Sequence, residues 1–209
     1  AGGARKNRCD YGFDIGTPTT HKRLRGPRGG MVLCKKSLGS KIGKSVFPGL
    51  QGGPHMNAIA AIAVTLLKAQ TDEFRQYASQ VLKNSKTLAK SLMDQQVSLI
   101  TGGTDNHMMV IDTVKSFGID GKVAEETLDK VAITTNKQII PDDPNPPLKP
   151  SGIRLGTPAA TTRGMDEEDM KRLADWMVTC LKDPGNEESC KKILDEVQEF
   201  CNRFPVPGI

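Results

Sequence analysis

The loop of residues 17–30 holds the side chains with the clearest chemical potential. Its sequence, TPTTHKRLRGPRGG, places His21 directly before Lys22, and a hydroxyl, that of Thr20, directly before the histidine. A lysine amine attacks a carbonyl only when it is neutral, and nearby cations or loss of water favour that form. The same loop carries arginines at positions 23, 25 and 28. The pattern predicts either a Schiff-base lysine, for a carbonyl compound or pyridoxal phosphate, or simply a solvated basic loop.

A glycine-rich segment, GLQGGP at residues 49–54, precedes an apolar stretch with helical character. Gly52 and Gly53 leave backbone N–H groups uncovered near a helix start, and such groups suit a phosphate. Glycines also serve turns that must pack closely. Taken alone, the segment favours that structural role.

A single arginine, Arg154, lies between glycines in the short apolar segment SGIRLGTP of residues 151–158. A guanidinium in such a setting requires an anion, and a carboxylate held by two parallel hydrogen bonds is the natural partner. That carboxylate belongs either to a bound ligand or to an acidic side chain of the same chain.

The composition indicates a globular protein with an aliphatic core. Of 209 residues, 37% are hydrophobic and 25% charged, whereas only 4% are aromatic. No apolar run is long enough to span a bilayer, and no secretory signal is visible. We therefore expect no membrane partner and a cytoplasmic location, with an organellar one left open.

The charge is distributed unevenly. Residues 1–50 carry eleven Lys or Arg and two Asp, while the whole chain has a net charge of only +5. A basic front predicts an anionic partner, which could be nucleic acid, a phosphate, a carboxylate or an acidic subunit. Aromatic residues do not interleave with the basic ones, which argues against a stacking surface for nucleic acid.

The cysteines and histidines do not predict a metal site. The five cysteines are odd in number and form no C-x-x-C, so neither a disulfide framework nor a zinc site is expected. A reducing compartment fits this pattern. Cys190 and Cys201 share the apolar face of the last expected helix, where they are most simply core residues.

Hydrophobic periodicity predicts a mixed α/β order. Residues 13–15 and 31–34 are expected to be buried strands, and residues 54–70 a helix buried on most sides. Thr71 is the expected N-cap of a following helix. The apolar stripe of that helix is Phe74, Ala78, Val81, Leu88 and Leu92.

Beyond residue 100 the pattern continues to alternate. The expected strands are residues 108–114 and 132–140, and the expected helices are residues 121–131, 166–181 and 187–204. Five prolines exclude regular structure from residues 141–150. A composition change near residue 70 is the best domain boundary, and the front piece has too few elements to bury both faces of a sheet.

Four segments together resemble the serine hydroxymethyltransferase family. They are TTHK followed by LRGPRGG in residues 19–30, VFPGLQGGPH in residues 46–55, TGGTDNH in residues 101–107 and SGIRLGTPA in residues 151–159. They occur in the family's order and correspond to its rear half. The resemblance implies an α/β fold of the aspartate-aminotransferase type, fold type I. Residues 1–70 would end the large cofactor-binding domain, and residues 71–209 would form the small C-terminal domain.

The resemblance implies roles for residues near the cofactor. Lys22 would hold pyridoxal 5'-phosphate as a Schiff base, with His21 and Thr20 beside it in proton transfer. Arg28 would join the polar network near the cofactor. Gly52–Gly53 would offer backbone to the phosphate of a cofactor in a neighbouring subunit, so a homodimer or tetramer would share its active sites.

The resemblance also implies the substrates. Arg154 would hold the carboxylate of serine or glycine, and the reaction would interconvert the two while passing a one-carbon unit to tetrahydrofolate. Gln138 stands where the family usually has an asparagine that contacts folate. Pro18 and Arg23 replace threonines that are common in the family.

In the family, the front half supplies a phosphate-binding Ser/Gly loop, a histidine that stacks on the cofactor, an aspartate for its ring nitrogen and a glutamate for proton transfer. We locate none of these in the sequence. We therefore expect activity to need a separate N-terminal half. One alternative is a non-catalytic truncated homologue that acts as an interaction or regulatory subunit or that binds nucleic acid. Another is a glycine decarboxylase, against which residues 47–55 and 151–159 argue.

Overall fold

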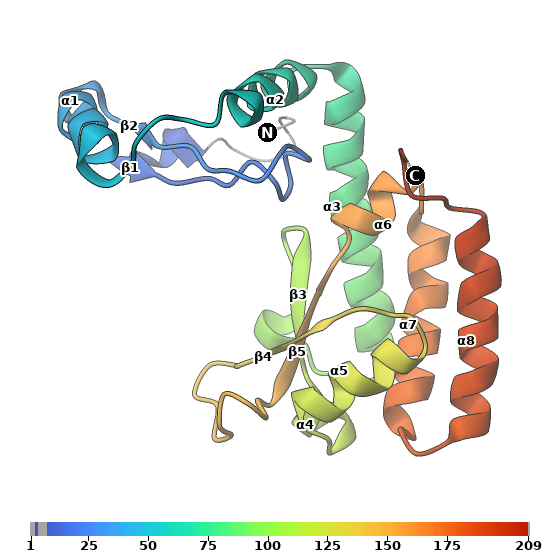
Figure 1. The fold of residues 1–209 in the computed structure, drawn as a ribbon. Helices are drawn as coiled ribbons and strands as arrows, with labels where there is room; N and C mark the ends of the chain where they lie inside the picture. Colours follow the sequence, from blue (N-terminus) through green and yellow to red (C-terminus); the bar gives the residue numbers. More distant parts are fainter. Residues whose placement is uncertain (1–2, 4–7, 209) are drawn as a thin grey trace. The chain divides into compact units, whose positions relative to one another are not determined.

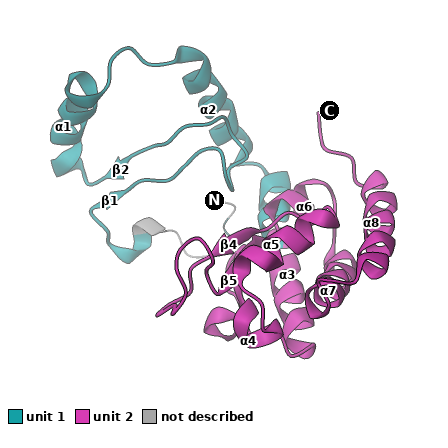
Figure 2. Cartoon of the chain, turned by 60° about the horizontal axis from the view of Figure 1, so that its bottom comes forward, with its two compact units in different colours: residues 1–79 teal, residues 80–209 magenta. Residues whose placement is uncertain are grey.

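The computed structural model describes residue 3 and residues 8–208, and it divides into two compact units. Unit 1 is Ala1–Ser79 and unit 2 is Gln80–Ile209 (Figure 2). The division falls within helix α3 (Asp72–Asp94), nine residues after the boundary expected from composition. Both units mix helices with small sheets, so the chain is an α/β protein (Figure 1). The assignment of the units to a large and a small domain stays a prediction.

Unit 1 consists of short elements. In chain order they are η1 (Arg8–Tyr11), β1 (Ile15–Gly16), β2 (Leu33–Cys34), α1 (Lys36–Lys44), η2 (Ser45–Leu50) and α2 (Met56–Lys68), followed by the start of α3. Strands β1 and β2 pair antiparallel, with Ile15 opposite Cys34. The prediction that these strands are buried is wrong, because neither contains a buried residue. Helix α1 was not expected from the sequence.

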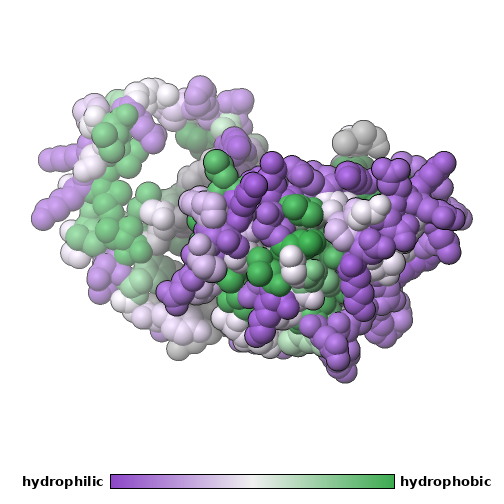
Figure 3. Space-filling view, turned by 90° about the horizontal axis from the view of Figure 1, so that it is seen from below, coloured by the Kyte–Doolittle hydropathy of each residue, from purple (hydrophilic) through white to green (hydrophobic). Residues whose placement is uncertain are grey.

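Helix α2 is apolar yet largely exposed. Thr65 is its one buried residue, so the prediction of a helix buried on most sides is wrong for this chain. Green apolar residues reach the surface of this unit, at the left of the space-filling view (Figure 3). Apart from Tyr11, the exposed large apolar residues in the described part of unit 1, here called the apolar surface, are Ile15, Val32, Leu33, Val46, Phe47, Leu50, Met56, Ile59, Val64, Leu66 and Leu67. Within the described part of unit 1, no second layer covers these apolar side chains.

Unit 2 is built on a three-stranded antiparallel sheet in the order β3-β5-β4. The strands are β3 (Met108–Asp112), β4 (Asn136–Gln138) and β5 (Gly152–Gly156). The helices of this unit are the rest of α3, α4 (Thr113–Phe117), α5 (Gly121–Lys130), α6 (Pro158–Thr162), α7 (Glu167–Lys182) and α8 (Glu187–Asn202), with a 3-10 turn, η3 (Ile100–Gly102). The strands and helices expected from the sequence are present, although β4 is much shorter than predicted. The prediction of strand at Thr113 and Val114 is wrong, because both lie in α4, and neither α4 nor α6 was expected.

One face of the sheet packs on helices. Ile111 and Ile153 are fully buried and share one apolar cluster with Leu88 and Leu92 of α3, Leu128 of α5, and side chains of α7 and α8. Side chains on adjacent strand positions point to opposite faces. Arg154 therefore lies on the other face of the sheet, and it is exposed.

Side-chain caps explain where the helices of unit 2 begin. Asp112, Asp120 and Asn186 accept backbone N–H groups at the starts of α4, α5 and α8. Asp166 forms a reciprocal capping box with Asp169 at the start of α7. These residues satisfy N–H groups that lack a partner within the helix.

Two smaller expectations are confirmed. Thr71 accepts the N–H of Phe74, as expected of an N-cap. In α8, Cys190 is buried and Cys201 packs partly buried against the same core. Among the described residues, no helix is long and apolar enough to cross a membrane.

Candidate active site

The loop that carries Lys22 is closed by its own backbone. The N–H of Thr20 donates to the carbonyl of Gly29 over 3.0 Å, and that of Gly26 donates to the carbonyl of Thr20 over 2.9 Å. The N–H of Arg25 donates to the carbonyl of Lys22 over 3.0 Å, which makes a tight turn at the lysine. The turn presents the Lys22 side chain outward, where it is exposed and has no hydrogen bond or ion pair to any described residue.

Thr20 is fully buried beneath this turn. Its hydroxyl donates to the carbonyl of Pro27 over 2.7 Å. The hydroxyl thus ties the two sides of the loop together in unit 1. Its predicted part in proton transfer stays a prediction.

His21 and Arg28 lie side by side in the same loop. Nδ1 of His21 is 3.1 Å from the carbonyl oxygen of Gly29, and Nε2 is 3.5 Å from Nη1 of Arg28. The N–H of Gly29 also lies 3.2 Å from Nδ1, so the ring is held between the backbone of Gly29 and the guanidinium of Arg28.

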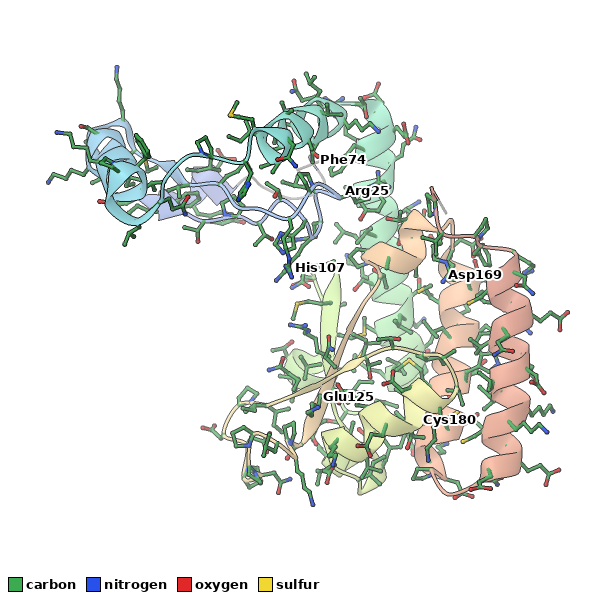
Figure 4. The ribbon with its side chains drawn as sticks, in the orientation of Figure 1. Arg25, Phe74, His107, Glu125, Asp169 and Cys180 are labelled. Carbon is green, nitrogen blue, oxygen red and sulfur yellow. The ribbon has the colours of Figure 1, made fainter. Side chains whose placement is uncertain are left out.

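A contact that the sequence analysis missed holds this loop against α3. The guanidinium of Arg25 lies 3.9 Å from the ring centre of Tyr77 and 5.7 Å from that of Phe74, within cation–π range (Figure 4). The sequence does contain a signal for this contact. Phe74 and Tyr77 lie three positions apart near the start of a helix, in a chain with few aromatic residues.

The loop also packs closely on α2 at Gly26. A Cβ atom at this position would lie 2.7 Å from the Thr65 hydroxyl oxygen and 2.8 Å from its methyl carbon. Thr65 is buried and its hydroxyl donates to the carbonyl of Ala61. A glycine is therefore required for the loop to approach the helix this closely.

Gly52 and Gly53 lie in the exposed segment between η2 and α2. A Cβ atom at either position would meet nothing within 4 Å. The backbone here is open, so it could approach a ligand, as the sequence analysis expected. Its contact with a phosphate stays a prediction.

The structure brings Arg154 and Gln138 onto one face of the sheet in unit 2. Arg154 pairs directly with Asn136 and Gly152 with Gln138, and paired residues share a face. Nη2 of Arg154 donates to Oδ1 of Asn136 over 3.2 Å. Asn136 was not predicted as a site residue. Its position two residues before Gln138 on a strand places both side chains on the same face, which the sequence could have indicated.

An ion pair fixes the opposite face of β4. Nζ of Lys137 lies 2.7 Å from Oε2 of Glu125, and the N–H of Lys137 donates to Oε1 (Figure 4). The hydrogen bond from the Lys137 ammonium, then that from its N–H, lowers the pKa of Glu125. The same pairing raises the pKa of Lys137. This pair anchors the strand to α5 and keeps Lys137 away from Arg154.

A shallow depression on unit 2 contains a motif noted above. It is lined by Lys86, Ala89 and Met93 of α3 and by residues 101–105, part of the TGGTDNH segment. It contains none of the predicted site residues. Lys22, His21, Thr20, Arg28, Gly52 and Gly53 belong to unit 1, whereas Arg154 and Gln138 belong to unit 2. That both groups serve one site stays a prediction.

The comparison with protein families agrees with this distribution of motifs. The family model described as serine hydroxymethyltransferase matches residues 1–177. The chain belongs to this family. The match spans unit 1 and the sheet of unit 2, so it includes every predicted site residue.

A curated relative gives the length of a family member. The serine hydroxymethyltransferase of Acidobacterium capsulatum is 49% identical over 208 residues, which cover 100% of this chain and 48% of the relative. The chain therefore spans about half the length of the curated relative that it matches.

Proposed function

We propose that the chain is the part of a serine hydroxymethyltransferase, also called glycine hydroxymethyltransferase, that carries the cofactor lysine and the substrate-carboxylate arginine. The enzyme interconverts serine and glycine and transfers the one-carbon unit to tetrahydrofolate. Family membership supports the reaction and a fold of type I. The observation that carries the proposal is the outward Lys22 amine on a loop that its own backbone closes.

The residues of unit 1 fit pyridoxal 5'-phosphate. The Lys22 amine is exposed and has no hydrogen bond or ion pair to any described residue, so an aldehyde can reach it. Lys22 would hold the cofactor, Arg28 would add positive charge beside it, and Gly52 and Gly53 would offer N–H groups to a phosphate. When bound, pyridoxal phosphate supplies the electron sink for the carbanion of the amino acid.

His21 would hold or move a proton in this account. Its ring is held by the backbone of Gly29 and the guanidinium of Arg28, directly before Lys22 in the chain. Thr20 would support it by keeping the loop closed. The side chain of Lys22, which follows His21, then projects from a fixed backbone.

Arg154 would bind and orient the carboxylate of serine or glycine. A guanidinium has five N–H donors, and only one bond to Asn136 is present among the described residues. The remaining donors are sufficient for bidentate contact with a carboxylate. Gln138, on the same face, would contact tetrahydrofolate through its amide.

The assembly extends the proposal. Sharing of Gly52–Gly53 between subunits would make a homodimer or a tetramer, and a cytoplasmic setting suits the free cysteines. The half of the relative that this chain does not match would complete the site.

The proposal is tested by supplying that half. The chain is co-expressed with the unmatched front half of the Acidobacterium capsulatum relative, and glycine formed from serine is measured with pyridoxal phosphate and tetrahydrofolate present. We expect turnover that Lys22→Arg abolishes and that Lys36→Arg, at an exposed lysine of α1, leaves intact. Turnover unaffected by Lys22→Arg, or its absence from a well-folded complex, contradicts the proposal.

A further inference from the structure

The segment of residues 139–151 joins the two strands that carry the proposed substrate contacts. Gln138 ends β4, and Gly152 begins β5 two residues before Arg154. The segment contains five prolines and no regular structure. Its conformation sets how the two strand ends meet.

One carboxylate, that of Asp143, holds both ends of this segment. Oδ2 accepts the N–H of Ile140 over 3.1 Å and that of Ser151 over 2.9 Å. Oδ1 accepts the N–H of Asn145 over 3.0 Å and the hydroxyl of Ser151 over 2.6 Å. Asp143 thus satisfies three backbone donors that no strand or helix serves.

The clamp is fixed to the core through Ser151, which is buried. Its carbonyl accepts both the N–H and the hydroxyl of Thr113 over 2.9 Å, and Thr113 is the fully buried first residue of α4, directly after β3. Asn145 also donates its side-chain amide to the Ser151 hydroxyl over 2.9 Å. The loop is therefore tied to the start of α4, and its own two ends, which follow β4 and precede β5, are held together.

The charge of Asp143 is stabilised in place. Partial desolvation raises its pKa, but the hydroxyl and N–H of Ser151 and the N–H groups of Asn145 and Ile140 outweigh it and lower the pKa well below its ordinary value. Its neighbour Asp142 is exposed and accepts no hydrogen bond from any described residue. The two adjacent aspartates therefore differ in role, which provides a matched control.

We propose that Asp143 is a positioning residue that sets the register and spacing of Gln138 and Arg154 for the substrate carboxylate and the folate. This inference rests on the proposed function. Asp143 lies outside the contacts with substrate and acts through Ser151 on β5 and through Ile140 on the end of β4. Its loss should weaken substrate binding more than the chemical step.

The clamp itself is tested on the chain by hydrogen exchange of backbone amides. In Asp143→Ala, we expect the amides of Ile140, Asn145 and Ser151 to exchange at least about tenfold faster, because each loses its acceptor. Asp143→Asn keeps one acceptor oxygen and should give a smaller increase. Asp142→Asn should change none of them. Unchanged exchange at all three amides in Asp143→Ala overturns the proposal.

Its role in binding is tested in the complex with the front half. We expect Asp143→Ala to raise the KM for serine about tenfold with kcat changed less than about threefold, since misplaced contacts cost mainly substrate orientation. Asp143→Asn should recover part of the loss, and Asp142→Asn should match the unmodified complex. Equal KM values for Asp143→Ala and Asp142→Asn overturn the positioning role. An unmodified complex without serine turnover contradicts the proposed function instead, while the exchange result still reports on the clamp.

Discussion

Arg154 illustrates how a single strand position can serve binding. The residues before and after it on β5, Ile153 and Leu155, point into the core, so the guanidinium projects from the opposite face. Asn136, directly across on β4, engages one of its nitrogens. Binding of a carboxylate by Arg154 therefore depends on how many of its guanidinium donors remain unused.

Arg154→Lys should raise the KM for serine about a hundredfold in the complex with the front half. An ammonium cannot reproduce two parallel hydrogen bonds to a carboxylate. Asn136→Ala, which frees the guanidinium without removing it, should cost less. Arg75→Lys, at an exposed arginine paired with Asp72, is the control and should leave the KM unchanged. A KM for Arg154→Lys equal to that of the control argues against carboxylate binding at this position.

The Glu125–Lys137 pair predicts a specific pH dependence. Glu125 has a lowered pKa in the folded chain, so its contribution is present above its ordinary pKa of 4.5 and is lost as the pH falls through the lowered value. Lys137 has a raised pKa, so its contribution is present below its ordinary value of 10.5 and is lost only above it.

Lys137→Gln should therefore lower the melting temperature at pH 7, and the difference from the unmodified chain should shrink as the pH falls below 4.5. Thermal unfolding across this range measures both. Lys122→Gln removes an exposed pair with Glu126 at 3.6 Å and should have a smaller effect at every pH. A difference that stays constant down to strongly acidic pH would show that the pair does not act through charge.

At the scale of elements, the Lys22 loop depends on close approach to α2. Its turn is closed by backbone hydrogen bonds, but its position against the helix depends on Gly26, Thr65 and the stacking of Arg25 on Tyr77. The loop is thus a packed element, although its composition alone resembles that of a solvated basic loop.

Gly26→Ala should destabilise unit 1 by about 1–3 kcal/mol, since the added methyl group must displace a buried β-branched side chain. Gly30→Ala is the matched change in the same loop, where the new carbon would lie 3.7 Å from the nearest atom outside its chain neighbours, and it should cost little. Urea unfolding followed by amide exchange in α2 compares the two. Equal stability of the two variants contradicts the packing described here.

The longer helices from α3 onward could be predicted from sequence because local signals determine them, whereas the five-residue helices α4 and α6 were not predicted. Caps such as Thr71 and Asp166 mark starts, and apolar stripes such as the one ending at Leu92 mark buried faces. The exposure of α2 could not be predicted, because hydropathy reports a preference for burial and not whether a covering layer is present. Asp143 was missed for a related reason, since its partners are backbone groups of residues whose own sequence carries no signal.

Some residues of the candidate site could likewise be predicted from the sequence, and others could not. Lys22 and Arg154 stand out by residue type, so both were selected from the sequence, and the match to the family spans both. Asn136 and Arg25 act through contacts made by strand register and by packing on a helix. Such contacts form only in the folded chain, so the spacing of residues in the sequence does not predict them.

At the scale of the whole molecule, the main feature is the apolar surface, which is exposed to solvent in this chain. It includes Leu50, 89% exposed, and Leu67, 66% exposed, and unit 1 has no described element that covers it. The chain spans about half the length of its relative. We therefore expect this surface to be where a front half packs.

The apolar surface should bind a hydrophobic dye in the free chain and lose that binding when the front half is added. Leu50→Ser combined with Leu67→Ser should reduce both dye fluorescence and the affinity for the front half. Leu148→Ser, at a residue of unit 2 that is 79% exposed, is the control and should change neither affinity nor the loss of dye on complex formation. Undiminished dye binding in the complex would place the contact elsewhere.

The most direct test of the central claim is the attachment point of the cofactor. The chain is mixed with pyridoxal phosphate, alone and with the front half, then reduced with borohydride and digested, and the modified lysine is identified by mass spectrometry. The account predicts an adduct concentrated at Lys22, strengthened by the front half and absent in Lys22→Arg, while Lys36→Arg leaves it unchanged. Adducts spread evenly over the exposed lysines in the complex, or an undiminished main adduct in Lys22→Arg, would contradict it.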